Sequence, residues 1–165
     1  MFIAHLPSGY LLAQGFRKTK QRGIVLAAMV GSIFPDMDML YFYLIDNRQH
    51  HHHSYWTHFP SIYLFLLLIV GIWWSIKKGS TAACLSFVFL LGCILHLVLD
   101  SLVGDIPWLA PFSMKFYALA TVEAVHKPWW LNFLLHWSFA AEVIIIVAAV
   151  IVFIKRRREK RQGLL

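Results

Sequence analysis

Histidine and aspartate residues of this sequence occur in short groups whose spacing suits a metal site. The groups that we single out are Asp36 with Asp38, His53 with His58, and His96 with Asp100. Mixed imidazole and carboxylate ligands favour zinc, manganese or iron, whereas magnesium and calcium prefer oxygen ligands alone. The set is larger than a single tetrahedral ion needs. We therefore expect one or two divalent transition-metal ions, with zinc as the first choice, and a pair of ions would suit hydrolysis.

The two aspartates follow a proline directly, in the order Pro35, Asp36, Met37, Asp38. A kinked turn at the proline would present both carboxylates to a cation, whereas an N-cap role would account for only one of them. His96 and Asp100 are four residues apart, so they project from one face of a helix. That second pair is weaker as a signal, because such pairs are more often simply hydrogen-bonded to each other.

The two histidines at positions 53 and 58 precede an apolar segment. His58 stands where an apolar residue would otherwise be expected, so we interpret it as a metal ligand. His53 lies in the polar loop 46–58. Because the ordinary pKa of histidine is near neutrality, we assign His53 the role of general acid or base. His50 to His52 are as consistent with a solvated loop as with a site.

The elements that must position these residues are apolar segments of membrane-spanning length. Of the 165 residues, 59% are hydrophobic and only 14% are charged, whereas soluble domains have about 25% charged residues. Residues 60–76, 81–100 and 131–154 are largely apolar, 23–45 is a fourth such segment interrupted at Pro35, and 8–16 is too short to span. We expect an all-α integral membrane protein with four main transmembrane helices and a short N-terminal membrane-embedded helix.

Positive charges fall at alternate connections between these segments. Twelve of the 15 lysine and arginine residues lie within 17–22, 77–78 and 155–161. The positive-inside rule makes that face cytoplasmic. We therefore divide the chain into a single helical membrane domain, 1–154, and a basic cytoplasmic tail, 155–165. The tail is interpreted as an anchor at anionic lipid headgroups, so we expect membrane lipid and not nucleic acid as a partner.

The histidine and aspartate groups then fall on the outer side of the membrane. Six acidic residues lie there with only three basic ones, and a carboxylate at membrane depth is costly unless it is paired, neutralised or bound to metal. Tryptophans at headgroup level mark the same side, namely Trp108, Trp129 and Trp130. Two further polar residues of the last apolar segment, His136 and Glu142, are expected to hydrogen-bond to neighbouring helices or to groups such as Ser138.

Four blocks of residues occur in a fixed order over roughly residues 1–115. They are His5, the run Pro35-Asp36-Met37-Asp38, the box from His53 through Thr57 to His58, and Leu91-Gly92 with His96, Asp100, Gly104 and Pro111. In order and spacing these blocks resemble a bacterial family of inner-membrane-associated, metal-dependent hydrolases, of which one member is described as LexA-regulated. The resemblance implies that His5 joins the metal ligands. It also implies a reaction class, hydrolysis, but no particular substrate.

The function that we expect is that of a membrane-embedded, metal-dependent hydrolase acting at the outer face of the bacterial inner membrane, on a lipid ester or phosphoester. The expected metal ligands are His5, Asp36, Asp38, His58, His96 and Asp100. The protein would cross the membrane several times, with its C-terminus in the cytoplasm and its site facing outward.

Three alternatives stay open from the sequence. Metal transport would need polar residues through the whole membrane depth, and the inner halves of the apolar segments have almost none. A lipid phosphatase of the broad-specificity acid phosphatase type shares a Ser-Gly pair and a His-x-x-x-Asp motif, but the outer face lacks arginines to hold phosphate. A non-catalytic membrane protein with a structural metal site is the third.

Overall fold

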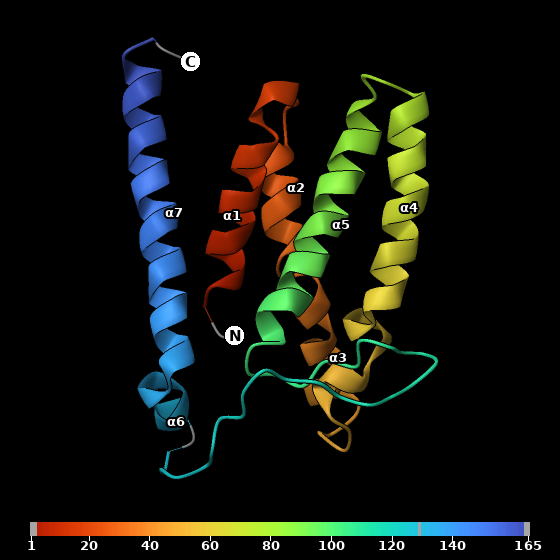
Figure 1. Cartoon of the computed structure of the whole chain (residues 1–165), viewed down its shortest axis with the longest axis vertical. Helices are drawn as coiled ribbons and strands as arrows, with labels where there is room; N and C mark the ends of the chain where they lie inside the picture. Colours follow the sequence, from red (N-terminus) through yellow and green to blue (C-terminus); the bar gives the residue numbers. More distant parts are fainter. Residues whose placement is uncertain (1–2, 129, 164–165) are drawn as a thin grey trace.

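The computed structural model describes residues 3–128 and 130–163, so Trp129 and the last two residues of the basic tail lie outside it. The described residues form helices and turns without a β-strand, and Ile106 and Tyr117 make an isolated β-bridge. The helices, shown in Figure 1, are α1 (His5–Gly15), α2 (Ile24–Gly31), α3 (Asp38–Leu44), α4 (Pro60–Ile76), α5 (Thr81–Asp100), α6 (Trp130–Leu135) and α7 (Trp137–Arg161). The predicted all-α class is confirmed.

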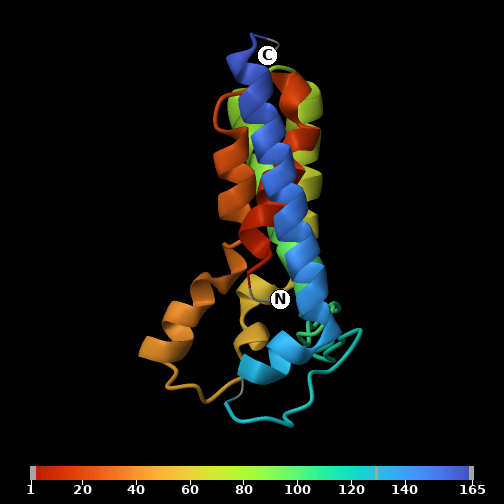
Figure 2. The same ribbon diagram turned by 90° about the vertical axis from the view of Figure 1, so that its left-hand side faces the viewer.

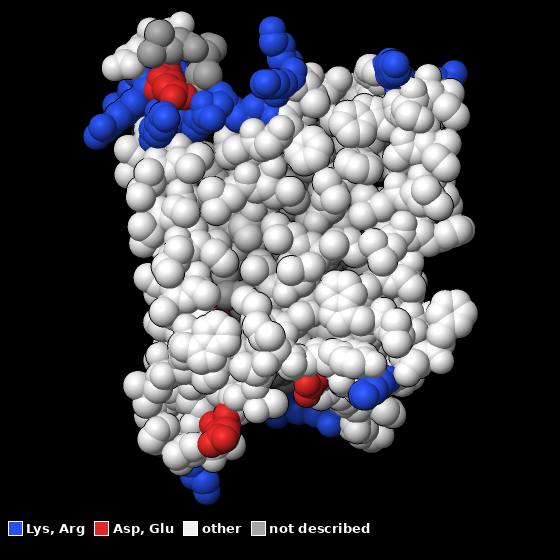
Figure 3. Space-filling view, in the orientation of Figure 1, with Lys and Arg blue, Asp and Glu red and all other residues white. Residues whose placement is uncertain are grey.

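The longer helices run along one common axis, and the shorter elements gather at one end (Figure 1). That end holds α3, α6 and the loop 101–128, and the C-terminus lies at the opposite end. Figure 3 shows a wide band without charged side chains between the two ends, and lysine and arginine gather at the C-terminal end. This distribution is that of a membrane protein.

Two helices, α5 and α7, are long and apolar enough to cross a membrane. A third candidate is α2 together with residues 35–44, a pair bent by 57°. The bend confirms the predicted kink at Pro35, which begins a 3-10 turn, Pro35–Met37. The apolar helix α4 has 17 residues, which is the lower end of the range of about 17 to 25 for a span.

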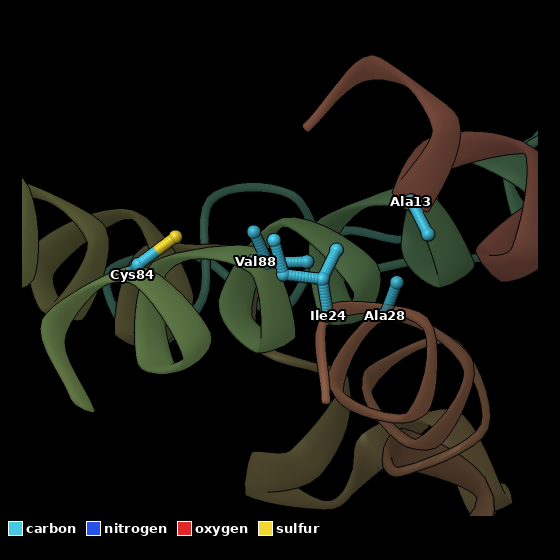
Figure 4. Close-up of a cluster of buried hydrophobic side chains, with 5 residues drawn as sticks. All are labelled: Ala13, Ile24, Ala28, Cys84 and Val88. Atoms are coloured by element: carbon cyan, nitrogen blue, oxygen red, sulfur yellow. The ribbon is translucent and has the colours of Figure 1, made fainter. Parts of the chain in front are cut away.

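Close contact between α2 and α5 depends on small residues. A side chain at Gly31 would collide with the backbone carbonyl of Phe89, and one at Gly92 would come within 2.7 Å of the carbonyl oxygen of Ala28. Small residues at helix crossings allow such close packing in membranes. The buried cluster around this crossing is apolar and consists of Ala13, Ile24, Ala28, Cys84 and Val88 (Figure 4).

The last apolar segment was predicted as one helix over 131–154, and the structure divides it at His136. This residue has an extended backbone (φ −80°, ψ 145°), and its Nδ1 accepts a hydrogen bond from the backbone N–H of Ser138 at 3.3 Å. The histidine therefore caps the start of α7 and ends α6. Helix α7 then continues through the basic residues to Arg161.

The side chain of Glu142 connects α7 to the beginning of α1. One of its oxygens accepts hydrogen bonds from the backbone N–H groups of Ile3 at 2.5 Å and Ala4 at 3.2 Å. These amides precede the first turn of α1, where N–H groups have no partner within the helix. The predicted hydrogen-bonding roles of His136 and Glu142 are therefore confirmed.

Candidate metal centre

Four of the predicted ligands meet where three elements come together. His96 and Asp100 project from the last turns of α5, Asp36 from the 3-10 turn after α2, and His58 from the 3-10 turn Trp56–His58 that precedes α4. Each offers one donor atom, and these atoms all lie within 4.8 Å of one another. This cluster could hold a metal ion.

Three residues of the cluster are buried, and the fourth is accessible to solvent. His58 and His96 are 0% exposed and Asp100 is 3% exposed, whereas the Asp36 side chain is 41% exposed. Within the cluster, His96 Nε2 lies 3.0 Å from Asp100 Oδ2 and 3.5 Å from Asp36 Oδ1. His58 Nε2 lies 3.8 Å from the same Asp36 oxygen. Asp36 is therefore the side through which solvent reaches the buried histidines.

The hydrogen bonds of the two buried histidines set which ring nitrogen faces the carboxylates. His96 Nδ1 lies 2.9 Å from the backbone carbonyl oxygen of Ser32, which can only accept, so Nδ1 carries the proton. His58 Nδ1 lies 2.7 Å from Asp38 Oδ2. The Nε2 atoms of both rings are buried without a hydrogen-bond partner. Metal-binding histidines are held in this way, by a protein acceptor on the other nitrogen.

The electrostatics of the cluster point in the same direction. The Nε2 atoms of His58 and His96 face carboxylate oxygens, and such contacts need a proton or a cation between the two atoms. A second proton on His96 would serve only the contacts of that ring, whereas a divalent cation among the four side chains would serve all of them. The donor set therefore fits a metal ion.

Asp38 was predicted as a ligand, and the structure places it behind His58, outside the group of four. Its Oδ2 accepts hydrogen bonds from Thr57 Oγ1 at 2.6 Å and from His58 at 2.7 Å. The reason is the local backbone: Asp36 lies in the 3-10 turn and Asp38 begins α3. Residues i and i+2 of a helical chain point in different directions, because each residue rotates the chain by about 100° to 120°. Asp36 and Asp38 therefore contact different partners, and Asp38 orients His58.

His5, included through the family resemblance, lies beside the cluster. Its Nε2 is 3.1 Å from Asp100 Oδ1, and its ring stacks on that of His96 with centroids 4.0 Å apart. The residue is 4% exposed. The bonds from Glu142 to the amides just before His5 hold this histidine in place. This positioning follows from the hydrogen bonds to a neighbouring helix that were predicted for Glu142.

His53, the predicted acid or base, also reaches the cluster. Its Nδ1 lies 3.0 Å from the backbone oxygen of Asp105, and its Nε2 lies 3.7 Å from Asp100 Oδ2. Burial, followed by the charges of His52 and His58, lowers the pKa of His53 to about 2. The near-neutral pKa that was expected is thus not found, and His53 is a neutral imidazole in the metal-free protein.

A cavity of about 500 Å³ adjoins these residues. Asp36, His53 and Asp100 line it together with His51 and His52, and its apolar walls come from Met39, Phe42, Val103 and Phe133. Gly104 also lines the cavity, and a side chain there would come within 2.9 Å of His53 Cε1. The polar cluster therefore opens into a space that could admit a molecule with both polar and apolar parts.

Other residues that drew attention in the sequence make their own contacts. His50 is bound to Asp46 in the exposed loop, with 2.7 Å between His50 Nδ1 and Asp46 Oδ1. Trp108 donates from Nε1 to Ser101 Oγ at 2.8 Å. His51, His52 and His53 form a second group of donor atoms within 4.8 Å of one another.

Comparison with known proteins identifies the family of this chain. The family described as YdjM inner membrane protein matches residues 1–160. The chain belongs to this family, in agreement with the resemblance found in the sequence. Comparisons with curated proteins and with solved structures gave no significant match.

Proposed function

We propose that this inner membrane protein of the YdjM family is a metal-dependent hydrolase that acts at the outer face of the membrane on an ester or phosphoester bond of a lipid. The observation that carries the proposal is the cluster of Asp36, His58, His96 and Asp100 at the wall of a cavity of about 500 Å³. A buried set of metal donors beside a cavity of mixed polarity is the usual arrangement of a metal hydrolase.

The residues that would hold one or two divalent metal ions are the four of the cluster, together with His5 on the second oxygen of Asp100. Zinc is the first choice, and manganese and iron suit the same donors. When bound, the metal would polarise the scissile bond and make water more acidic. Asp38 would hold the His58 ring in the orientation that directs Nε2 at the cluster.

His53 would act as the proton acceptor. It is neutral, it lies on the cavity wall, and its Nε2 is 3.7 Å from Asp100 Oδ2. The Asp105 carbonyl at 3.0 Å from Nδ1 holds the ring and leaves the lone pair on Nε2. A water molecule between His53 and the cluster would give its proton to Nε2 as it attacks the substrate.

The proposed topology has four spans: α2 with α3, then α4, α5 and α7, with α1 as a partial helix. The basic connections and the tail would face the cytoplasm, since lysine and arginine concentrate at that end (Figure 3). Asp100 ends α5, and His58 precedes α4 at its first turn. The metal centre would therefore lie just below the outer surface, at the depth of lipid headgroups.

A lipid suits this location and this cavity. Met39, Phe42 and Phe133 would contact an acyl chain while the polar junction of the lipid lies over the carboxylates. Helix α3 leans away from the bundle beside the cavity (Figure 2) and exposes Leu40 and Leu44. As the outer end of the span that it forms with α2, this exposed apolar helix would lie at the membrane interface.

The main alternative is metal transport. A transporter needs a polar path across the membrane. The buried cluster of Ala13, Ile24, Ala28, Cys84 and Val88 fills the helix crossing on the side toward the basic end, and it is entirely apolar. This packing disfavours passage of an ion. A structural metal site without catalysis is distinguished by the experiment below.

The test is to purify the protein, measure bound metals, and incubate wild type and Asp36→Ala with total membrane lipid before mass spectrometry. We expect a lipid to disappear and a hydrolysed product to form only with the wild type, only with metal, and not after chelation. His126→Ala, in the exposed loop, is the matched control. Identical lipid profiles across all metals would favour the non-catalytic alternative. Turnover of soluble esters alone would exclude the lipid.

A further inference from the structure

We propose that His51, His52 and His53 form a second site for a divalent transition-metal ion, at the mouth of the cavity, from which ions pass to the buried cluster. The buried cluster would obtain its metal through this outer site whether or not the protein catalyses hydrolysis.

The geometry of the three rings suits a common ion. Each offers one nitrogen, and these nitrogens lie within 4.8 Å of one another. The ring centroids of His52 and His53 are 3.8 Å apart, and those of His51 and His53 are 5.1 Å apart. Three imidazoles are a ligand set that zinc accepts, with a fourth position left for water.

The backbone at the three histidines departs from the alternation of an extended chain, which would point neighbouring residues in opposite directions. His51 is extended (φ −68°, ψ 128°), and residues 52–54 then form a 3-10 turn. Ser54 closes this turn by donating from its backbone N–H at 2.8 Å and from its hydroxyl at 2.6 Å to the His51 carbonyl.

The fourth histidine of the run is excluded from this group. The side chain of His50 is 66% exposed and is bound to Asp46, which also accepts from the His50 backbone N–H at 3.0 Å. This contact turns His50 away from its three neighbours. The run His50 to His53 thus divides into one histidine held by a carboxylate and three that face one another.

Burial increases along the three histidines in the direction of the cluster. His51 is exposed, His52 is half-buried and His53 is buried. All three line the same cavity as Asp36 and Asp100. The ring of His53 lies 4.6 Å from that of His58, between centroids. An ion held at the mouth is thus next to the buried donors.

His53 is the residue that both sites share. Its Nδ1 is engaged by the Asp105 carbonyl, so a single lone pair, on Nε2, is available. That atom is also 3.7 Å from Asp100 Oδ2. This lone pair can bind only one ion at a time. An ion bound by His53 in the outer site could therefore leave His53 and bind the carboxylates of the buried cluster. The outer site, with neutral ligands and solvent access, would be the weaker one.

The test uses the full-length protein in detergent, stripped by a chelator and then titrated with zinc in competition with a fluorescent chelator. Zinc uptake by the buried cluster is followed by stopped flow at limiting zinc. The variants are His51→Ala combined with His52→Ala, the matched control His50→Ala, and Asp36→Ala combined with His96→Ala. His51→Ala alone, at an exposed position, serves if the double variant does not fold.

We expect the His51/His52 variant to lose one weak equivalent of zinc and to fill its tight site more slowly, while His50→Ala behaves as wild type. The proposal would be overturned if wild type, the His51/His52 variant and His50→Ala all bound the same number of zinc ions. It would also be overturned if His50→Ala lost as much zinc as the His51/His52 variant. A lost equivalent with unchanged uptake rate would overturn the transfer. The Asp36/His96 variant should keep the weak equivalent and lose the tight one; if it keeps both, the proposed buried centre fails while the outer site stands.

Discussion

Asp38 is hydrogen-bonded to His58, with 2.7 Å between Asp38 Oδ2 and His58 Nδ1. The opposite ring nitrogen, Nε2, is thereby directed toward Asp36. Asp38→Asn should therefore weaken zinc binding by about tenfold while leaving stoichiometry unchanged. Asp36→Asn should weaken it further, because a donor of the cluster is altered directly. Competition with a chelator measures both, and Asp46→Asn in the exposed loop is the control. Equal effects at positions 36 and 38 would contradict the distinction between ligand and orienting residue.

His96 and Asp100 contribute two buried donors to the cluster from the last turns of α5. We expect His96→Ala and Asp100→Ala each to abolish stable metal binding, measured by elemental analysis of the purified protein. His126→Ala should retain the wild-type metal content. Circular dichroism and size exclusion establish that the variants are folded. Wild-type metal content in folded Asp100→Ala protein would show that the ion binds elsewhere.

Gly104 leaves room for His53. Since an added Cβ would lie 2.9 Å from His53 Cε1, Gly104→Ala should displace the ring from the cavity wall. The expected result is a loss of hydrolysis with metal content retained at the buried cluster. Gly15→Ala, whose Cβ would meet nothing within 4 Å, is the control. Unchanged turnover in Gly104→Ala would argue against His53 as the proton acceptor.

The low pKa of His53 gives the metal-free protein a defined pH dependence. In the unfolded chain this histidine takes up a proton near its ordinary pKa of about 6.5, whereas in the folded protein burial lowers that pKa to about 2. The unfolded state therefore binds more protons as pH falls below about 6.5, and stability decreases by at most about 1.4 kcal/mol per pH unit.

Thermal unfolding of the metal-free protein between pH 7.5 and pH 5 measures this effect, with the range chosen around the ordinary pKa of about 6.5. His53→Gln should unfold with a shallower dependence on pH than wild type over that range. The same slope in both proteins would assign the pH dependence to other groups.

The proposed topology predicts opposite labelling of two loops. Cysteine at Gln49 should react with an impermeant thiol reagent in intact cells, and cysteine at Lys78 only after permeabilisation. The native cysteines, Cys84 and Cys93, are buried, so their background labelling should be low. Equal reactivity of both positions in intact cells would overturn the four-span arrangement.

The helices on either side of the turn 77–80 were predicted with their correct ends. The starts of α4 and α5 have strong local signals, a proline at the first position of α4 and Ser80, whose side chain accepts from the Ala83 N–H at 3.3 Å. The break at His136 had no such signal. It depends on the hydrogen bond from the Ser138 N–H to the His136 imidazole, and the apolar sequence on both sides gives no indication of that bond.

The sequence predicted which residues meet at the candidate site better than it predicted the role of each residue. Asp36, His58, His96 and Asp100 could be grouped because all four fall on the outer side of the predicted membrane segments, where a carboxylate at membrane depth needs a partner. Spacing alone could not separate Asp36 from Asp38, since the direction of a carboxylate in a 3-10 turn depends on its partners. For the same reason His50 could not be distinguished from His51.

The bonds from Glu142 to the amides of Ile3 and Ala4 join α7 to the residues just before α1. His5 is therefore synthesised well before the carboxylate that holds its helix in place. The contact that holds His5 in place can form only after a residue more than a hundred positions later has been synthesised. Assembly of the centre is therefore a late event of biogenesis, and a chain truncated before α7 would insert most of its helices and still lack a properly placed His5.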